Sequence, residues 1–194
     1  MTRRFLFLLG SSRADGNTEL LARRAAEQLP GDVEQQWIDL AAHPLPDFED
    51  LRHDSDFTRP TDGNTGLLFD ATTTATDIVI ASPLYWYSVS AHTKRYLDHW
   101  AGWLRIPGVD FRATMAGRTL WGVTALADHE PVVAAPLIGT LNNSAAYLKM
   151  RFGGVLLGNG SKPGDVLTDA EALTRAKTFF QQEAPLARFA FEED

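Results

Sequence analysis

The segment FLFLLGSSRADGNT, residues 5–18, joins a short apolar run to a polar loop that contains two glycines. Five consecutive apolar residues, Phe5 to Leu9, are typical of a strand that is covered on both faces of a sheet. After the loop, apolar side chains recur one turn apart over Thr18–Leu29, which predicts a helix with Asn17 or Thr18 as its N-cap. The segment therefore predicts the strand–loop–helix unit of an α/β protein.

The rest of the chain repeats this alternation of strand and helix patterns. Further strands are expected at Val33–Asp39, Asp77–Ser82, Thr119–Ala125 and Phe152–Leu157. Helices are expected at Gly66–Ala75, Ser88–Trp103 and Val132–Lys149, and a last helix begins at a capping box of Thr168 and Glu171. A long acidic loop, residues 43–66, interrupts the pattern. Five strands in alternation with helices imply right-handed crossovers and a parallel sheet with helices on both faces, in a single domain over residues 1–194.

Composition and charge limit the classes of protein to be considered. The 194 residues are 44% hydrophobic and 22% charged, as expected for a globular chain with one core. A net charge of −7 argues against nucleic acid or an anionic membrane as the partner, and no apolar run is long enough to span a bilayer. Without Cys the chain has no disulfide, thiol nucleophile or cysteine-held metal cluster, which fits the cytoplasm. Any redox reaction then requires a bound cofactor.

The polar loop after the first strand carries a candidate anion site. Ser11, Ser12, Arg13, Asn17 and Thr18 can all donate hydrogen bonds to a phosphate, and the adjacent helix N-terminus favours a negative charge. The loop lacks both the G-x-G-x-x-G pattern of dinucleotide sites and the Lys of a P-loop, so a monophosphate fits better. The alternative is that residues 16–18 only form a capped turn. The same four residues, DGNT, recur at 62–65 without a preceding strand, where a plain turn is expected.

Three adjacent aromatic residues, Tyr85, Trp86 and Tyr87, follow the strand expected at 77–82. Because they cannot all point into one core, some of the rings are expected at the surface, in a pocket or at an interface. In a parallel sheet the loops after neighbouring strands meet at the carboxyl edge, where the strand order reverses. A flat aromatic ligand beside this wall is the functional interpretation, and core or dimer packing is the alternative.

Other polar side chains have simpler interpretations. Asp128 and His129 could donate a proton near the same edge, although a solvated loop is the alternative. His92 and His99 lie seven residues apart without a carboxylate at a matching spacing, so no metal site is expected. Asp39 is expected to be a strand-end or turn residue, because the glycine fingerprint of a dinucleotide site is missing.

Taken together, the two loops resemble those of the NAD(P)H-dependent FMN reductase family of flavodoxin-like proteins. The residues that carry the resemblance are Gly10 to Arg13, Gly16 to Thr18, Ser82 to Trp86, Ser90, Ala91, Lys94, Leu97 and Asp98. Ile38 to Leu40, followed by Pro44 to Pro46, is also similar to what the family places after its second strand. The spacing of the expected strands agrees with the family across nearly the whole chain.

The resemblance implies a flavodoxin-like three-layer sandwich whose five-stranded parallel sheet has the order 2-1-3-4-5. It also implies that FMN is bound. The phosphate would be held by Ser11, Arg13, Asn17 and Thr18, and the isoalloxazine ring would lie along Pro83, Leu84, Tyr85, Trp86 and Tyr87. The family often carries glycine in the third loop, whereas residues 124–130 read TALADHE here. A homodimer or dimer of dimers is implied as well, and the tryptophan-rich region Trp100–Leu104 is expected to be exposed as its surface.

The implied activity is an oxidoreductase reaction with NADPH or NADH as cosubstrate. Hydride passes to the flavin, and electrons then pass to a small acceptor such as a flavin, quinone, azo or nitro compound. Because the cofactor performs the bond chemistry, no catalytic residue is assigned. One alternative is a flavodoxin-type electron carrier without pyridine-nucleotide turnover. A second is a phosphate-handling hydrolase, for which the sequence has no Cys nucleophile, G-x-S-x-G motif or paired-carboxylate metal motif.

Overall fold

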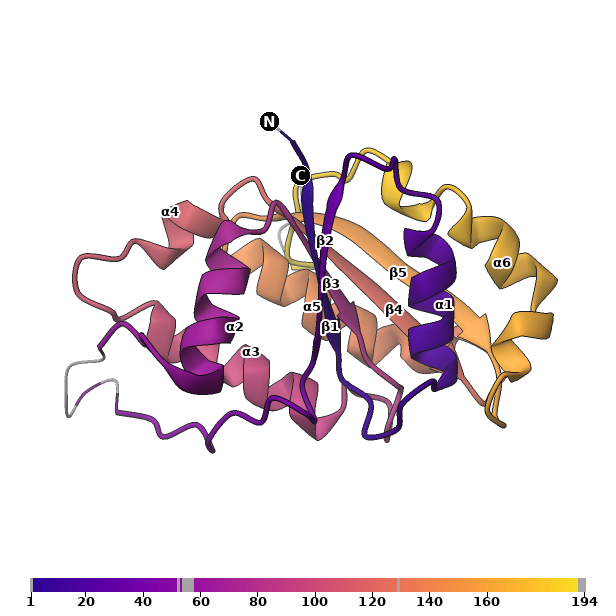
Figure 1. Ribbon diagram of the computed structural model, residues 1–194, viewed down its shortest axis with the longest axis horizontal. Coiled ribbons are helices and arrows are strands. Elements are labelled where there is room, and N and C mark those ends of the chain that lie inside the picture. Colours follow the sequence, from indigo (N-terminus) through magenta and orange to yellow (C-terminus); the bar gives the residue numbers. More distant parts are fainter. Residues whose placement is uncertain (1, 52, 54–57, 129, 192–194) are drawn as a thin grey trace.

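A five-stranded parallel sheet forms the centre of the computed structural model, which describes residues 2–51, 53, 58–128 and 130–191 (Figure 1). Its strands are β1 (Arg4–Leu9), β2 (Glu34–Asp39), β3 (Asp77–Ala81), β4 (Thr119–Leu126) and β5 (Arg151–Asn159). All neighbours pair in parallel in the order β2-β1-β3-β4-β5, so the predicted order 2-1-3-4-5 is confirmed. Because β2 and β3 lie on opposite sides of β1, the direction of winding reverses between β1 and β3.

Helices cover both faces of the sheet, which confirms the three-layer architecture (Figure 1). Along β1, Phe5 and Phe7 pack toward one layer of helices, and Leu6 and Leu8 pack toward the other, as the twofold period of a strand requires. One layer consists of α1 (Asn17–Ala26) and α6 (Ala170–Ala176), and the other of α2 (Gly63–Thr74), α3 (Ala91–Trp103), α4 (Phe111–Met115) and α5 (Ala135–Tyr147). Short 3-10 turns lie at Pro131–Ala134, Asp165–Thr168 and Phe179–Gln181.

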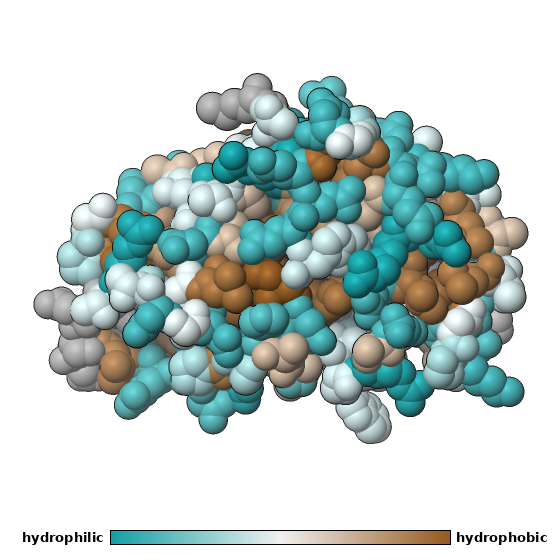
Figure 2. Space-filling model, in the orientation of Figure 1, coloured by the Kyte–Doolittle hydropathy of each residue, from teal (hydrophilic) through white to brown (hydrophobic). Residues whose placement is uncertain are grey.

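The surface differs in character from these two cores. Hydrophilic side chains cover most of the face seen in Figure 2, and hydrophobic ones show between them in smaller areas. Within the described residues, no helix is long and apolar enough to cross a membrane.

The first helix begins and ends at different residues from those that the sequence predicts. Its N-cap is Gly16, and neither Asn17 nor Thr18 caps it, because both residues lie inside the first turn. At the other end, α1 stops at Ala26 rather than at residue 29. The amide of Glu27 still bonds four residues back to Arg23, but those of Gln28 and Leu29 bond to carbonyls three residues back, which tightens the chain as it leaves the helix.

Two further helices differ from their predicted starts. The second copy of DGNT is not a plain turn, because Asp62 is the N-cap of α2 and the helix starts at Gly63 instead of Gly66. Helix α5 starts at Ala135 instead of residue 132, because Pro136 fits only in the first turn of a helix. The residues before it form the 3-10 turn at 131–134. The short helix α4 has no counterpart in the sequence prediction.

Side-chain caps define the starts of α3 and α6. Helix α3 starts at Ala91 rather than at the predicted Ser88, because Ser90 is its N-cap and accepts a hydrogen bond from the amide of Thr93 at 3.2 Å. The predicted capping box at Thr168 is wrong by one residue, since Asp169 is the N-cap of α6 and accepts from the amide of Ala172 at 2.9 Å. Burial acts to raise the pKa of Asp169, but hydrogen bonds from backbone amides and the charge of Arg175 outweigh it and lower that pKa. The carboxylate is therefore ionised at neutral pH, which is favourable at a helix N-terminus.

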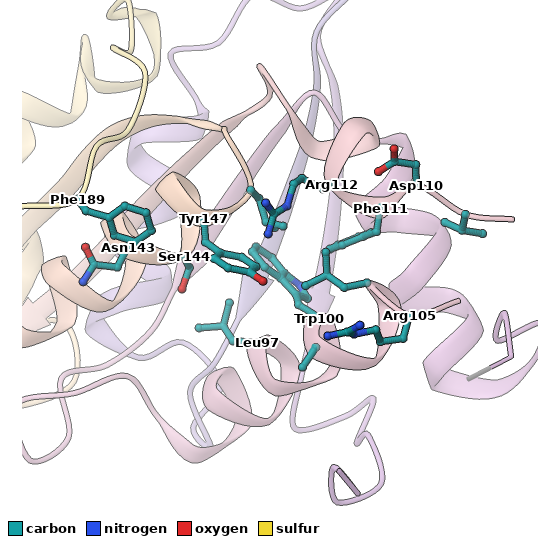
Figure 3. A pocket seen from close by; sticks show the side chains of 14 residues that line it. Leu97, Trp100, Arg105, Asp110, Phe111, Arg112, Asn143, Ser144, Tyr147 and Phe189 are labelled. Carbon is teal, nitrogen blue, oxygen red and sulfur yellow. The ribbon is translucent and has the colours of Figure 1, made fainter. Parts of the chain in front are cut away.

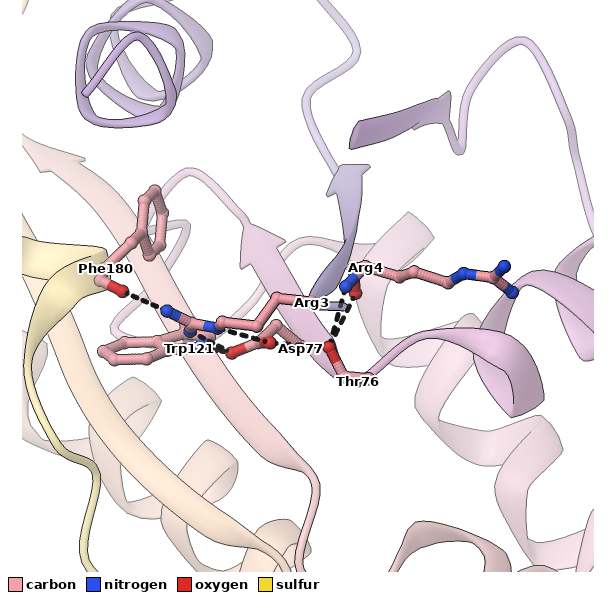
Figure 4. Close-up of polar contacts among 6 residues, drawn as sticks. All are labelled: Arg3, Arg4, Thr76, Asp77, Trp121 and Phe180. Atoms are coloured by element: carbon pink, nitrogen blue, oxygen red, sulfur yellow. Dashed lines mark hydrogen bonds and ion pairs between the residues drawn. The ribbon is translucent and has the colours of Figure 1, made fainter. Parts of the chain in front are cut away.

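A buried carboxylate joins distant parts of the chain at the amino ends of the strands (Figure 4). Asp77 is 3% exposed and accepts hydrogen bonds from Arg3 at 2.5 and 3.1 Å, from Thr76 Oγ1 at 2.8 Å and from the indole of Trp121 at 2.9 Å. Arg3 also donates to the carbonyl of Phe180 at 2.9 Å. One acid thus connects β3, β4, the start of the chain and the segment after α6.

Replacing Asp77 by Ala should destabilise the fold more than removing an exposed ion pair. The loss leaves the buried indole of Trp121 without its acceptor and Arg3 without its partner, at a cost of about 2–4 kcal/mol in the free energy of unfolding. Arg4→Ala is the matched control, since the Arg4–Glu34 pair is exposed and such a pair contributes about 0–1 kcal/mol. Urea titration measures both losses, and equal losses would contradict the role given to Asp77.

Candidate functional site

A cavity of about 510 Å³ lies at the carboxyl ends of the strands, where the winding reverses between β1 and β3. Four loops line it, one each after β1, β3, β4 and β5. The lining residues are Ser11, Ser12, Arg13, Gly16, Asn17, Thr18, Pro83, Leu84, Tyr85, Ala125, Ala127, Gly160, Ser161 and Pro163. The structure thus brings together the residues that the sequence nominates for a cofactor, except Trp86 and Tyr87, which do not line this cavity.

Close packing at Gly10 brings the first two loops together. A Cβ atom on this residue would lie 2.1 Å from Thr93 Oγ1, so only glycine allows the first turn of α3 to approach the end of β1. The amide of Gly10 donates to the carbonyl of Ala81 at 2.9 Å, and the amide of Ser90 donates to Ser82 Oγ at 2.9 Å. These contacts hold the loop after β3 against the loop after β1.

The loop after β1 leaves hydrogen-bond donors at the start of α1. Gly16 is the N-cap, and no side chain caps this terminus. Because the first amides of a helix have no intrahelical acceptor, those of α1 can bind an anion. Ser11 Oγ accepts from the amide of Arg13 at 3.0 Å, which folds the loop and leaves the hydroxyl hydrogen for a further partner. Arg13 is exposed at the cavity and supplies positive charge there.

Asn17 and Thr18 line the cavity with side chains that have partners in the protein. Thr18 is buried, and its Oγ1 accepts from the amide of Ala125 at 3.2 Å. Asn17 donates through Nδ2 to the carbonyl of Lys162 at 2.9 Å and accepts through Oδ1 from the amide of Val166 at 3.4 Å. The start of α1 is therefore connected to the ends of both β4 and β5.

The aromatic residues after β3 form a tight hairpin. Tyr85 and Ser88 exchange two backbone hydrogen bonds of 3.1 Å, and Trp86 and Tyr87 between them have φ values of +49° and +65°. Positive φ at both central residues is type I′ geometry, which favours Asn and Gly and costs energy for bulky side chains. The three rings are 49%, 93% and 56% exposed, which confirms that they do not share one core. Tyr85 alone among them lines the cavity.

The loops after β4 and β5 form two further walls, of which only the second has no counterpart in the sequence prediction. Ala125 and Ala127 follow β4, in the third loop, where small side chains stand in place of the glycine expected from the resemblance. Gly160, Ser161 and Pro163 follow β5. Glycines after a strand indicate a loop that a ligand could approach closely. However, β5 is the edge strand, so its loop is not expected to reach the point between β1 and β3 where the cavity lies. Only the return of its loop toward α1 brings these residues to the cavity.

Asp128 and Asp39, two further sequence candidates, do not line this cavity. The carboxylate of Asp128 accepts from the amide of Glu130 at 2.9 Å and so folds its own loop, and His129 lies outside the described residues. Asp39 accepts from the amide of Ala41 at 2.8 Å, which confirms the prediction of a strand-end turn residue. Within the described ranges, no three His, Asp or Glu residues gather in a way that could hold a metal ion.

A second, larger groove of about 870 Å³ lies between α3, α5 and the segment around α4 (Figure 3). The expectation that Trp100–Leu104 exposes its tryptophans is wrong, because Trp100 and Trp103 are 5% and 3% exposed and pack into the core. Both tryptophans lie on the inner face of α3, which packs on the sheet. Trp100 still contributes to the lining of the groove, together with Arg112, whose guanidinium lies 4.3 Å from the ring centre of Tyr147.

Comparison with protein families gives one match of substantial length. The family model described as NADPH-dependent FMN reductase matches residues 3–136. The Bacillus subtilis (strain 168) protein named "Putative NAD(P)H-dependent FMN-containing oxidoreductase YwqN" is 29% identical over 174 residues, which are 89% of this chain and 94% of that protein.

Solved structures share the fold. The Trp repressor binding protein from Bacillus subtilis superposes with a TM-score of 0.70 at 24% identity, over 92% of this chain and 99% of that chain. An NAD(P)H:quinone oxidoreductase from Methanothermobacter marburgensis superposes with a TM-score of 0.67 at 16% identity, over 94% and 97%. These likenesses show that the architecture is flavodoxin-like.

Relieving the strained hairpin should stabilise the protein. Trp86→Asn combined with Tyr87→Gly places at positive φ the two residues that prefer it, and we expect the free energy of unfolding to rise by about 1–2 kcal/mol. The matched control is Trp86→Ala, which removes the exposed indole and keeps a Cβ atom at positive φ. Urea denaturation distinguishes them. If the control is stabilised as much as the double variant, strain in the turn is not the cause.

Proposed function

Because this chain belongs to the NADPH-dependent FMN reductase family, we propose that its FMN binds in the 510 Å³ cavity at the carboxyl ends of β1 and β3. The protein is an enzyme of the NAD(P)H-dependent FMN oxidoreductase type, with FMN as cofactor and NAD(P)H as cosubstrate. One observation carries the placement of the cofactor. The cavity combines an uncapped helix N-terminus and an arginine with apolar and aromatic side chains, as a molecule with a phosphate and a flat ring requires.

The phosphate is proposed to lie at the start of α1. Arg13 supplies charge, and the first amides of the helix, including that of Asn17, supply directed hydrogen bonds. Ser11 and Thr18 accept bonds from backbone amides through their oxygens, so each hydroxyl hydrogen can be donated to the phosphate. These four residues are the phosphate ligands of the proposal.

The isoalloxazine ring is proposed to lie along the segment after β3. Pro83, Leu84 and Tyr85 supply apolar and aromatic surface inside the cavity. Trp86 and Tyr87 extend the same segment outward as exposed rings, where they can contact the outer part of the flavin or a bound substrate. Ala125 and Ala127 have side chains small enough to leave room for a ring on the opposite side.

Bound FMN supplies the redox chemistry, since it takes hydride from NADPH or NADH and passes electrons to an acceptor. The protein residues orient the ring, limit the access of water and hold the phosphate. We assign no acid or base among the described residues. The acceptor is proposed to be a small molecule, such as a flavin, quinone, azo or nitro compound, that occupies the place of the nicotinamide after it leaves.

We also propose that the chain forms a homodimer or dimer of dimers through the groove beside α3 and α5. Its lining combines the indole of Trp100 with Arg112, and such residues are common in interfaces (Figure 3). Sedimentation velocity is expected to show two or four chains per particle. Arg112→Glu, which places an acid in this groove, should shift the protein toward monomers. A wild-type monomer at all concentrations would contradict the proposal.

The enzymatic proposal predicts a flavin absorption spectrum after incubation with FMN and removal of excess ligand. The loaded protein should then oxidise NADPH or NADH in the steady state when a quinone or free flavin is present. Loss of absorbance at the nicotinamide band measures the reaction. A flavodoxin-type carrier would bind FMN and give essentially no oxidation, and a protein that retains no flavin would rule out the proposed site.

Arg13→Ala tests whether FMN binds with its phosphate at the start of α1. Loss of one charge-assisted hydrogen bond should weaken FMN binding by about 1–3 kcal/mol, which is roughly 5- to 150-fold. Riboflavin lacks the phosphate and should bind the variant and the wild type about equally. Fluorescence titration with both flavins measures this difference, and unchanged FMN affinity would show that Arg13 does not hold the phosphate.

A further inference from the structure

The loop after β5 forms one wall of the cavity although its strand is distant from the centre of the site. In the sheet, β3 and β4 separate β5 from β1, yet Gly160, Ser161 and Pro163 line the same cavity as the start of α1. These residues lie outside the range 3–136 that the family model matches. Something other than strand order must therefore hold this wall in place.

The side chain of Asn17 makes the connection from α1. Its Nδ2 donates to the carbonyl of Lys162 at 2.9 Å, and its Oδ1 accepts from the amide of Val166 at 3.4 Å. Both halves of the amide group are therefore bonded to one loop. The loop is also folded internally, because the carboxylate of Asp165 accepts from the amides of Ser161 and Lys162 at 3.2 and 2.7 Å. Asn17 thus binds a preformed turn.

A second contact shows how closely the two segments fit. A Cβ atom on Gly160 would lie 2.9 Å from Asn17 Nδ2 and 2.8 Å from the amide nitrogen of Val166. Any larger residue at this position would push the loop away from α1. On its other side, the amide of Gly160 donates to the carbonyl of Leu126 at 2.8 Å, which fixes the loop to the end of β4. Gly160 therefore lies between two neighbours with no space for a side chain.

We propose that the side chain of Asn17 is a positioning residue that closes the flavin cavity by holding Gly160–Pro163 against α1, and that it is not itself a phosphate ligand. The inference rests on the proposed function and deepens it. Asn17 still serves the phosphate through its backbone amide, which a substitution of the side chain leaves in place. Of this segment, Gly160, Ser161 and Pro163 line the cavity and Lys162 does not, so the wall adds no charge to the cavity lining and the positive charge for the phosphate comes from Arg13.

The experiment compares FMN with riboflavin in matched variants. Asn17→Ala should weaken binding of both flavins by a similar factor of about tenfold, because the whole cavity opens when one or two neutral hydrogen bonds are lost. Arg13→Ala is the matched control and should weaken FMN alone. Gly160→Ala should give the loss seen for Asn17→Ala, and the double variant should lose little more, since both changes release the same loop. Asn17→Ser, whose side chain is too short to reach both partners, serves as a second variant if Asn17→Ala does not fold.

Hydrogen exchange of the flavin-free protein gives an independent readout. The amide of Val166 should exchange faster in Asn17→Ala than in the wild type and should be unchanged in Arg13→Ala. Selective loss of FMN affinity in Asn17→Ala, with riboflavin binding and Val166 exchange unchanged, would make Asn17 a direct phosphate ligand and overturn the inference alone. Failure of the wild type to bind either flavin would overturn the proposed function and the inference with it.

Discussion

The contact between Gly10 and Thr93 is the constraint on which the site depends. A side chain at Gly10 would collide with Thr93 Oγ1, so the missing Cβ atom is what lets α3 begin directly beside the end of β1. Together with the hydrogen bond from the amide of Ser90 to Ser82 Oγ, it places the aromatic segment next to the loop proposed to bind the phosphate. Neither loop alone can hold a molecule with a phosphate and a ring. The two loops are adjacent because the strands are parallel and because α3 approaches Gly10 closely.

The two ends of the sheet differ in how completely their polar groups are hydrogen-bonded. At the amino ends of the strands, the carboxylate of Asp77 is buried and accepts hydrogen bonds from Arg3 and Trp121. At the carboxyl ends, α1 begins without a side-chain cap, and Trp86 and Tyr87 have positive φ. Unsatisfied donors and backbone strain are tolerated where a ligand can use them. The paired carboxylate at the opposite end is instead buried among hydrogen-bond partners, where loss of one partner is costly.

The start of α1 carries two kinds of polar side chain that look alike in the sequence. Ser11, Arg13 and Thr18 keep donors for a ligand, whereas the side chain of Asn17 is bonded through both its nitrogen and its oxygen to the loop after β5. A short motif can therefore bind a ligand and assemble its own binding site. In the proposed site an NAD(P)H-dependent FMN oxidoreductase needs both, because a phosphate site without closed walls would leave the flavin ring exposed to water.

The sequence by itself determined the strands, their alternation with helices and, through the resemblance, the order 2-1-3-4-5 and the cofactor class. It also placed the exposed aromatic rings at Tyr85–Tyr87, because three adjacent rings cannot share one core. Tertiary structure decided the burial of Trp100, the cap at Asp169 and the wall at Gly160. Apolar periodicity and turn residues are local properties that a sequence displays directly. Which side chains meet across the cavity depends on contacts between segments up to 149 residues apart, and only the folded chain brings these together.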